Sequence, residues 1–242
     1  MTDGTDDADP HSVAAERRAV RTRSFGIGIA VGSYGAGFGA LAVANGLSMV
    51  QAVVMSLFVF TGASQFALIG VVGAGGAALS GTVAALALGV RNAFYGLRMA
   101  PTLNVRGLRR LAAAQITIDE STAVAISQPT PDLARQGFWS TGLTIFVCWN
   151  TATLIGALAA DQISDPSVIG LDAAVGAAFL ALLWPQLTTR TRQLVAGLSA
   201  LLALALTPVL PPGLPVLLAA AVGITAAWPE PGGHHTEGTR DV

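Results

Sequence analysis

Two long apolar runs between positions 50 and 102 each carry strongly polar residues near the middle. The first is interrupted by Thr61-Gly62-Ala63-Ser64-Gln65, and the second carries Arg91-Asn92. Runs of this length approach the roughly 20 residues that cross about 30 Å of hydrocarbon. A guanidinium at that depth costs from about 3 kcal/mol upward, so such residues commonly mark a path for a solute or an ion. We therefore expect a helical membrane protein with a polar site inside it.

Composition favours this class over a soluble fold. Of 242 residues, 52% are hydrophobic and 11% are charged, against about 25% charged residues in an ordinary soluble domain. All thirteen cationic side chains are arginine, and most lie between apolar runs, as in polytopic membrane proteins. The net charge of −1 argues against a nucleic-acid partner. With a single cysteine and histidines confined to the tails, we expect no disulfide, metal site or cofactor.

The chain is expected to hold one membrane domain between two polar tails. Residues 1–24 are predicted to form a disordered cytoplasmic tail, residues 25–228 a helical transport domain, and residues 229–242 a second disordered tail. The domain is predicted to be all-α, with about six to seven transmembrane or re-entrant segments. The apolar runs cover 25–44, 51–72, 77–99, 138–160, 168–184, 194–210 and 214–228, and a shorter polar helix is predicted at 111–127.

The first apolar run carries glycines four residues apart, at Gly28/Gly32 and Gly35/Gly39. Small residues at this spacing form a helix face that packs closely against another helix. A cleaved signal peptide is the competing interpretation, because Ala42-Val43-Ala44 resembles a cleavage site. The length of the run and the further runs after it favour an uncleaved span.

The placement of arginine predicts the orientation in the inner (plasma) membrane. The basic cluster at 17–23 places the N-terminus in the cytoplasm. If the run at 51–72 re-enters and returns to its own side, the arginines at 106–110 also lie in the cytoplasm, and every loop obeys the bias. In the alternative, all three runs cross and 111–127 inserts as a short extra span. We favour the re-entrant arrangement.

The interruption of the second run is a candidate substrate site, with Gly62, Ser64 and Gln65 as its members. Transporters place such breaks at the substrate because the freed amides and carbonyls face the ligand. The positive N-terminal end of a half-helix suits a carboxylate. The alternative is a continuous helix that uses the serine and glutamine for hydrogen bonds to other helices.

Further candidates for substrate binding lie on the following helix. Arg91, Tyr95 and Arg98 share one face, and Asn92 flanks it. Arg91 lies roughly 9 Å from the helix end, so it either reaches the headgroups or binds a substrate carboxylate or an acid within the membrane. Asp172, in the second turn of a later predicted helix, is a candidate for the substrate ammonium.

Asp119 and Glu120 are the candidates for proton coupling. A buried carboxyl group has a raised pKa and can load and release a proton. The alternative is a helix on the cytoplasmic surface, where the same two acids carry no transport role.

Several of these motifs resemble those of the AzlC-type branched-chain amino-acid permeases, over about residues 25–228. The matching segments are Met55 to Phe66, Arg91-Asn92-Ala93-Phe94-Tyr95-Gly96-Leu97 with Ala100-Pro101, Asp119-Glu120, Gly170-Leu171-Asp172, and Phe179 to Pro185. One departure is Asn92, which stands where the family pattern has histidine. If that histidine contributes to coupling, coupling differs in this chain.

The resemblance implies a membrane transporter that exports branched-chain amino acids together with a small AzlD-type membrane subunit. The residues alone support a polytopic helical transporter. They give no sign of an enzyme, because the sequence lacks the signatures of zinc proteases, serine hydrolases and P-loop proteins. The rival functions are transport of another small organic anion, and a membrane subunit that serves assembly without transporting.

Overall fold

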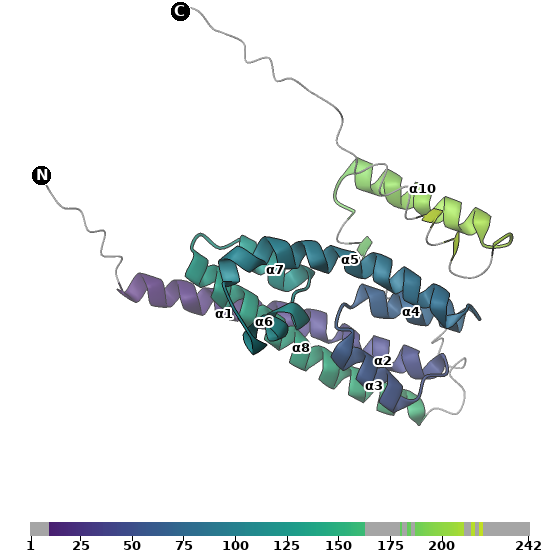
Figure 1. The fold of residues 1–242 in the computed structure, drawn as a ribbon, viewed down its shortest axis with the longest axis horizontal. Coiled ribbons are helices and arrows are strands. Elements are labelled where there is room, and N and C mark those ends of the chain that lie inside the picture. Colours follow the sequence, from purple (N-terminus) through teal and green to yellow (C-terminus); the bar gives the residue numbers. More distant parts are fainter. Residues whose placement is uncertain are drawn as a thin grey trace, which may run out of the picture. The chain divides into compact units, whose positions relative to one another are not determined.

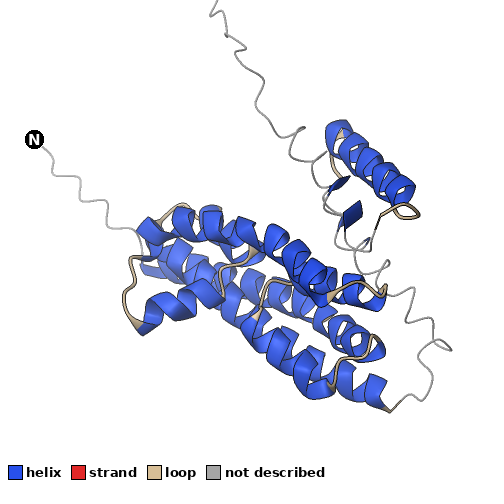
Figure 2. Ribbon diagram, turned by 45° about the vertical axis from the view of Figure 1, so that its right-hand side comes forward, coloured by secondary structure: helices blue, strands red, loops and turns tan. Residues whose placement is uncertain are grey.

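A computed structural model describes residues 10–162, 180, 183–184, 187–210, 214–215 and 218–219. These residues form helices and no strand, which confirms the predicted all-α class (Figure 2). The chain divides into two compact units, Met1–Leu183 and Trp184–Val242. The predicted tail at 229–242 and Asp172 lie outside the described residues.

The first unit contains the helices that carry the candidate site (Figure 1). They are α1 (Pro10–Gly32), α2 (Tyr34–Ala44), α3 (Met49–Phe58), α4 (Ala63–Gly73), α5 (Ala78–Leu103), α6 (Leu108–Gln115), α7 (Asp119–Ile126) and α8 (Pro131–Asp161). The second unit contains α10 (Arg190–Leu206), which overlaps the predicted run at 194–210 and begins four residues before it.

Within the described part of the chain, two helical stretches are long and apolar enough to cross a membrane, judged by length and composition. They are Ser12–Ala44, which joins α1 and α2, and Pro131–Asp161, which is α8. Residues 10–24 belong to α1, so this part of the chain is helical and not the disordered tail that the sequence predicted. The helix continues because the residues between Pro10 and Phe25 include no helix breaker, and alanine and arginine among them favour helix.

Glycines bring α1 and α2 into close contact with α8. The pairs are Gly28 with Thr144, Gly32 with Cys148, Gly35 with Trp149 and Gly39 with Thr153. The residue numbers of the contacting positions increase together along both stretches, so α8 runs parallel to α1 and α2. At Gly39 an added Cβ would overlap the Thr153 carbonyl. The packing face predicted from the glycine spacing is therefore confirmed.

The apolar run predicted at 51–72 forms a helical hairpin of α3 and α4. Gly73, at the end of α4, contacts Asn45, which lies just before the start of α3. The bend between the helices lies at Gly62, beside Trp149 near the middle of α8. The run therefore enters the bundle, turns near its centre, and returns to the end from which it came.

A second hairpin, made of α6 and α7, replaces the single short helix predicted over 111–127. The helix is interrupted between Ile116 and Ile118, and Ser121 holds the turn. The Ser121 hydroxyl accepts a hydrogen bond from the Ile118 amide at 3.1 Å and donates one to the Ile116 carbonyl at 2.7 Å. The backbone polar groups at the interruption are thus bonded locally.

The two hairpins enter the first unit from opposite ends. The second hairpin follows the end of α5 and precedes the start of α8, and Val124 of α7 packs against Gly137 near that start. Its tip meets the tip of the first hairpin, because the Gln115 side-chain amide donates to the Leu57 carbonyl at 2.7 Å.

One end of the first unit gathers the start of α1, the end of α5 and the start of α8. The Gln136 amide donates to the Arg17 carbonyl at 2.7 Å, and Arg135 Nε donates to the Thr102 carbonyl at 2.8 Å. The arginines at 17–23 and 106–110 lie at this end, which we call the arginine-rich end. This is the arrangement that the re-entrant alternative predicts.

Candidate functional site

The break between α3 and α4 exposes the N-terminus of a half-helix near the centre of the bundle. Gly62 has φ +62° and ψ −88°, a conformation that glycine adopts without a Cβ penalty. The amides of Gln65 and Phe66 donate to the Gly62 carbonyl at 3.0 and 3.3 Å. The amides of Ala63 and Ser64 come before these and have no acceptor within the described part of the chain. They are donors available to an anion.

Side chains at this break hold polar atoms that are buried and incompletely bonded. Gln65 has no exposed surface, and its amide nitrogen makes one long hydrogen bond of 3.4 Å to the Met55 carbonyl. Its Oε1 and the Thr61 hydroxyl have no partner among the described residues. A buried polar group left unsatisfied costs about 1–3 kcal/mol. Such groups call for an explanation, and a bound solute or water is one.

An ion pair lies at a similar depth in the bundle to the break. Arg91 Nη2 of α5 contacts Asp119 Oδ2 at the start of α7 at 2.7 Å, and the two side chains keep 40% and 38% of their surface exposed. Tyr95, one turn after Arg91, lies within hydrogen-bonding reach of the same carboxylate. Gly89 of α5 lies against the Ser64 hydroxyl. Because Gly89 is two residues before Arg91, the ion pair and the amide end of α4 lie at a similar depth along α5.

The ion pair bears on the alternatives for Arg91 and Asp119. The Arg91 guanidinium contacts a carboxylate of the same unit, as the interpretation of Arg91 as a partner of an acid predicts. The roles of both residues in transport stay predictions. Because both side chains are partly exposed, the pair is accessible to a small polar molecule.

Glu120 follows Asp119 in the first turn of α7 and forms neither of the ion pairs found within the described residues. The helix is eight residues long, too short to span. Burial, chiefly, and the neighbouring Asp119 raise the pKa of the Glu120 carboxyl, while its own backbone amide and Arg91 act in the opposite direction. The fold therefore favours the neutral form of Glu120.

The remaining predicted residues take different positions. Asn92 has a buried side-chain oxygen with no partner among the described residues, so it resembles Gln65 in being incompletely bonded. Asp172 lies outside the described residues. Among the described residues, no group of three or more histidine, cysteine or acidic side chains is positioned to hold a metal ion.

Two site residues were missed by the sequence analysis. Gln115 joins the tips of the two hairpins, because its side-chain amide bonds the Leu57 carbonyl near the end of α3. This role becomes visible only once the helix is known to end at Gln115. Trp149 is 3% exposed and its ring stacks on Phe38 and meets Phe66 edge-on, with centroids 6.4 and 6.2 Å apart. Its Nε1 has no partner in the described structure. A tryptophan next to Asn150 in the middle of an apolar run was the available signal.

Comparison with known proteins gives two matches. The family described as AzlC protein matches residues 26–163, which include both hairpins and the ion pair. A protein of Archaeoglobus fulgidus named as an uncharacterized membrane protein is 34% identical over 163 residues, covering 66% of this chain and 71% of that protein. No solved structure matches the chain.

Proposed function

Because the chain belongs to the AzlC protein family, a family of membrane transport proteins, we propose that it exports branched-chain amino acids such as leucine, isoleucine and valine. The observation that carries the proposal is the Arg91–Asp119 ion pair of 2.7 Å, at a similar depth along α5 to the amide end of α4. A partly exposed pair of opposite charges at mid-bundle is complementary to a zwitterion.

An amino acid can replace each partner of this ion pair with one of its own charges. The α-carboxylate would bind Arg91, with the free amides of Ala63 and Ser64 as further donors. The α-ammonium would bind Asp119, or the unbonded Oε1 of Gln65. Asp172 stays a candidate for the ammonium from the sequence alone.

The apolar side chain of the substrate would lie against the aromatic cluster behind the break. Phe38, Phe66 and Trp149 pack together there, and apolar surface removed from water contributes roughly 25 cal/mol per Å². An aliphatic side chain gains from this cluster, whereas a small organic anion without one does not. This favours a branched-chain amino acid over the rival solute class.

The proposal includes the membrane setting and the partners. We infer that the chain lies in the plasma membrane with its arginine-rich end in the cytoplasm, following the preference of arginine for that side. A small AzlD-type membrane subunit would complete the exporter. Glu120 or Asp119 would carry the coupling proton.

The test is efflux of labelled leucine from cells loaded with a leucine dipeptide. Cells that express the chain with the small subunit should lose internal leucine faster than cells that express neither. Excess isoleucine and valine should slow that loss, whereas acetate or lactate should not. Equal efflux with and without the chain would refute transport of leucine, and competition by the organic anions alone would favour the rival substrate class.

A further inference from the structure

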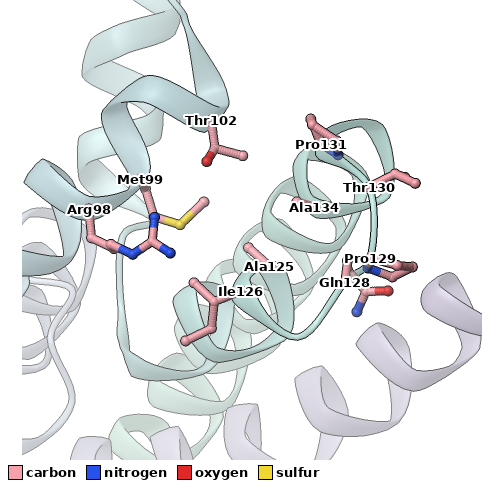
Figure 3. A pocket seen from close by; sticks show the side chains of 10 residues that line it. All are labelled: Arg98, Met99, Thr102, Ala125, Ile126, Gln128, Pro129, Thr130, Pro131 and Ala134. Atoms are coloured by element: carbon pink, nitrogen blue, oxygen red, sulfur yellow. The ribbon is translucent and has the colours of Figure 1, made fainter.

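A cavity of about 200 Å³ lies at the arginine-rich end, between the end of α5, the end of α7 and the start of α8 (Figure 3). Pockets for drug-sized ligands measure roughly 300–1,000 Å³, so this one suits a smaller solute. The residues that matter for its chemistry are Arg98, Met99, Thr102, Ile126, Gln128 and Thr130. None of them belongs to the site at the hairpin tips.

The cavity lining offers three kinds of contact. Arg98 supplies a cation, and Figure 3 shows its guanidinium directed toward the space that Met99 and Ile126 also border. The Gln128 amide nitrogen donates to the Val124 carbonyl at 2.9 Å and to the Ser127 hydroxyl at 3.2 Å. Its Oε1 is therefore left as an acceptor. A cation, an acceptor and an apolar wall together match an aliphatic zwitterion.

The cavity lies on the same pair of helices as the ion pair. Arg98 follows Arg91 by seven residues on one face of α5, which is about 10 Å along the helix axis. On the opposing helix, α7 begins at Asp119 and ends at Ile126, which lines the cavity. A solute in the cavity is thus about two helical turns from the Arg91–Asp119 pair.

We propose that this cavity is a vestibule that binds the amino acid before it reaches the ion pair. Arg98 binds the α-carboxylate, and Gln128 Oε1 accepts a hydrogen bond from the α-ammonium. Met99 and Ile126 contact the aliphatic side chain. The inference rests on the proposed function for the identity of the solute. Arg98 is a capture residue, so it determines how well dilute substrate is used rather than the maximal rate.

The first test compares efflux kinetics in proteoliposomes that contain the chain with its small subunit. Arg98→Ala should raise the internal leucine concentration needed for half-maximal efflux about five- to tenfold, with the maximal rate unchanged within about twofold. Arg98→Lys should restore most of the loss because it keeps the charge. Arg110→Ala, another exposed arginine at this end, is the matched control and should behave as wild type. An unchanged half-maximal concentration in Arg98→Ala would overturn the proposal.

The second test measures binding and does not depend on transport. In a Cys148→Ala background, Ile126→Cys should react with a membrane-impermeant maleimide, and millimolar leucine should slow the reaction at least threefold. The protection should persist in Arg91→Leu, which disables the inner site, and should disappear in Arg98→Ala. Absence of protection in the background protein would overturn the vestibule even if leucine efflux is observed. If leucine slows the labelling but no leucine efflux is observed, the proposed vestibule stands and the proposed export is refuted.

Discussion

Gln65 occupies a position where a glutamine is hard to explain by packing alone. It is fully buried, the one hydrogen bond of its side chain within the described residues is 3.4 Å long, and its side-chain oxygen has no partner there. A leucine of similar size would avoid this cost, since replacing a buried polar group by an apolar one of similar shape is close to neutral for stability. The proposed site offers one explanation for the glutamine, which is binding of substrate, and folding offers the other.

The variant Gln65→Leu separates these two explanations. We expect its free energy of unfolding to stay within about 1 kcal/mol of wild type, while leucine efflux falls at least tenfold because Oε1 is lost. Thermal stability in detergent and efflux from proteoliposomes provide the two measurements. A fully active Gln65→Leu protein would remove this residue from the site.

Glu120 allows a prediction about pH. Its pKa is raised in the folded chain, so the charged carboxylate is disfavoured by folding. The stability associated with its neutral form is fully present below the pKa of the unfolded chain, about 4.3, and is lost as pH rises through the folded pKa. Glu120→Gln should therefore melt at a higher temperature than wild type at pH 8.

The difference between the Glu120→Gln and wild-type melting temperatures should shrink steadily as the pH is lowered toward 4. Ser127→Ala, near the end of the same helix, should show no such trend and serves as the control. A difference that is constant from pH 4 to pH 8 would contradict the assignment of a raised pKa to Glu120.

Among the elements, α2 and α8 are held together by backbone contact at glycines. A Cβ at Gly39 would lie 2.9 Å from the Ala157 nitrogen and overlap the Thr153 carbonyl, whereas a Cβ at Gly37 would meet nothing within 4 Å. Overpacking of this kind costs about 1–3 kcal/mol or more. Gly39→Leu should accordingly lower the thermal stability of the purified protein by several degrees.

Gly37→Leu is the matched control for that substitution, because it makes the same change two residues away in open space. It should leave the melting temperature near that of wild type. Melting can be followed by fluorescence-detected size exclusion after heating. If the two variants proved equally stable, the close approach of α2 and α8 would be incorrect.

The two helix interruptions differ in how far the sequence predicts them. The break at Gly62 follows from a glycine beside small polar residues in an apolar run, and the structure places it there. The break between Ile116 and Ile118 contains neither glycine nor proline. β-Branched residues lower helix propensity only slightly, and the turn depends on bonds from Ser121. Serine also occurs inside helices, so these local bonds do not mark a turn in the sequence.

For the molecule as a whole, the positions of the arginines predicted the topology that the hairpins produce. The N-terminal arginines and those at 106–110 share one end only because the first hairpin returns to the end from which it came. The pairing of Arg91 with Asp119 was not predictable, since it needs a second hairpin whose tip reaches the same depth from the opposite end. Long-range contacts of this kind require the fold.

The topology predicts labelling from opposite sides of the membrane. In a Cys148→Ala background, Ala77→Cys lies between the first hairpin and α5, and Leu108→Cys starts α6; both side chains are exposed. An impermeant thiol reagent added outside intact cells should label only Ala77→Cys, and Leu108→Cys should react only after lysis. Labelling of both from one side would contradict the re-entrant first hairpin.

The most direct test of the central site uses Arg91→Leu, Asp119→Leu and the double variant. If the ion pair binds the zwitterion, all three should lose leucine efflux at least tenfold, with the double variant as stable as wild type because no unpaired charge remains. If the pair only holds α5 to α7, the double variant should regain activity. Wild-type efflux from folded Arg91→Leu/Asp119→Leu protein would contradict the proposed substrate site.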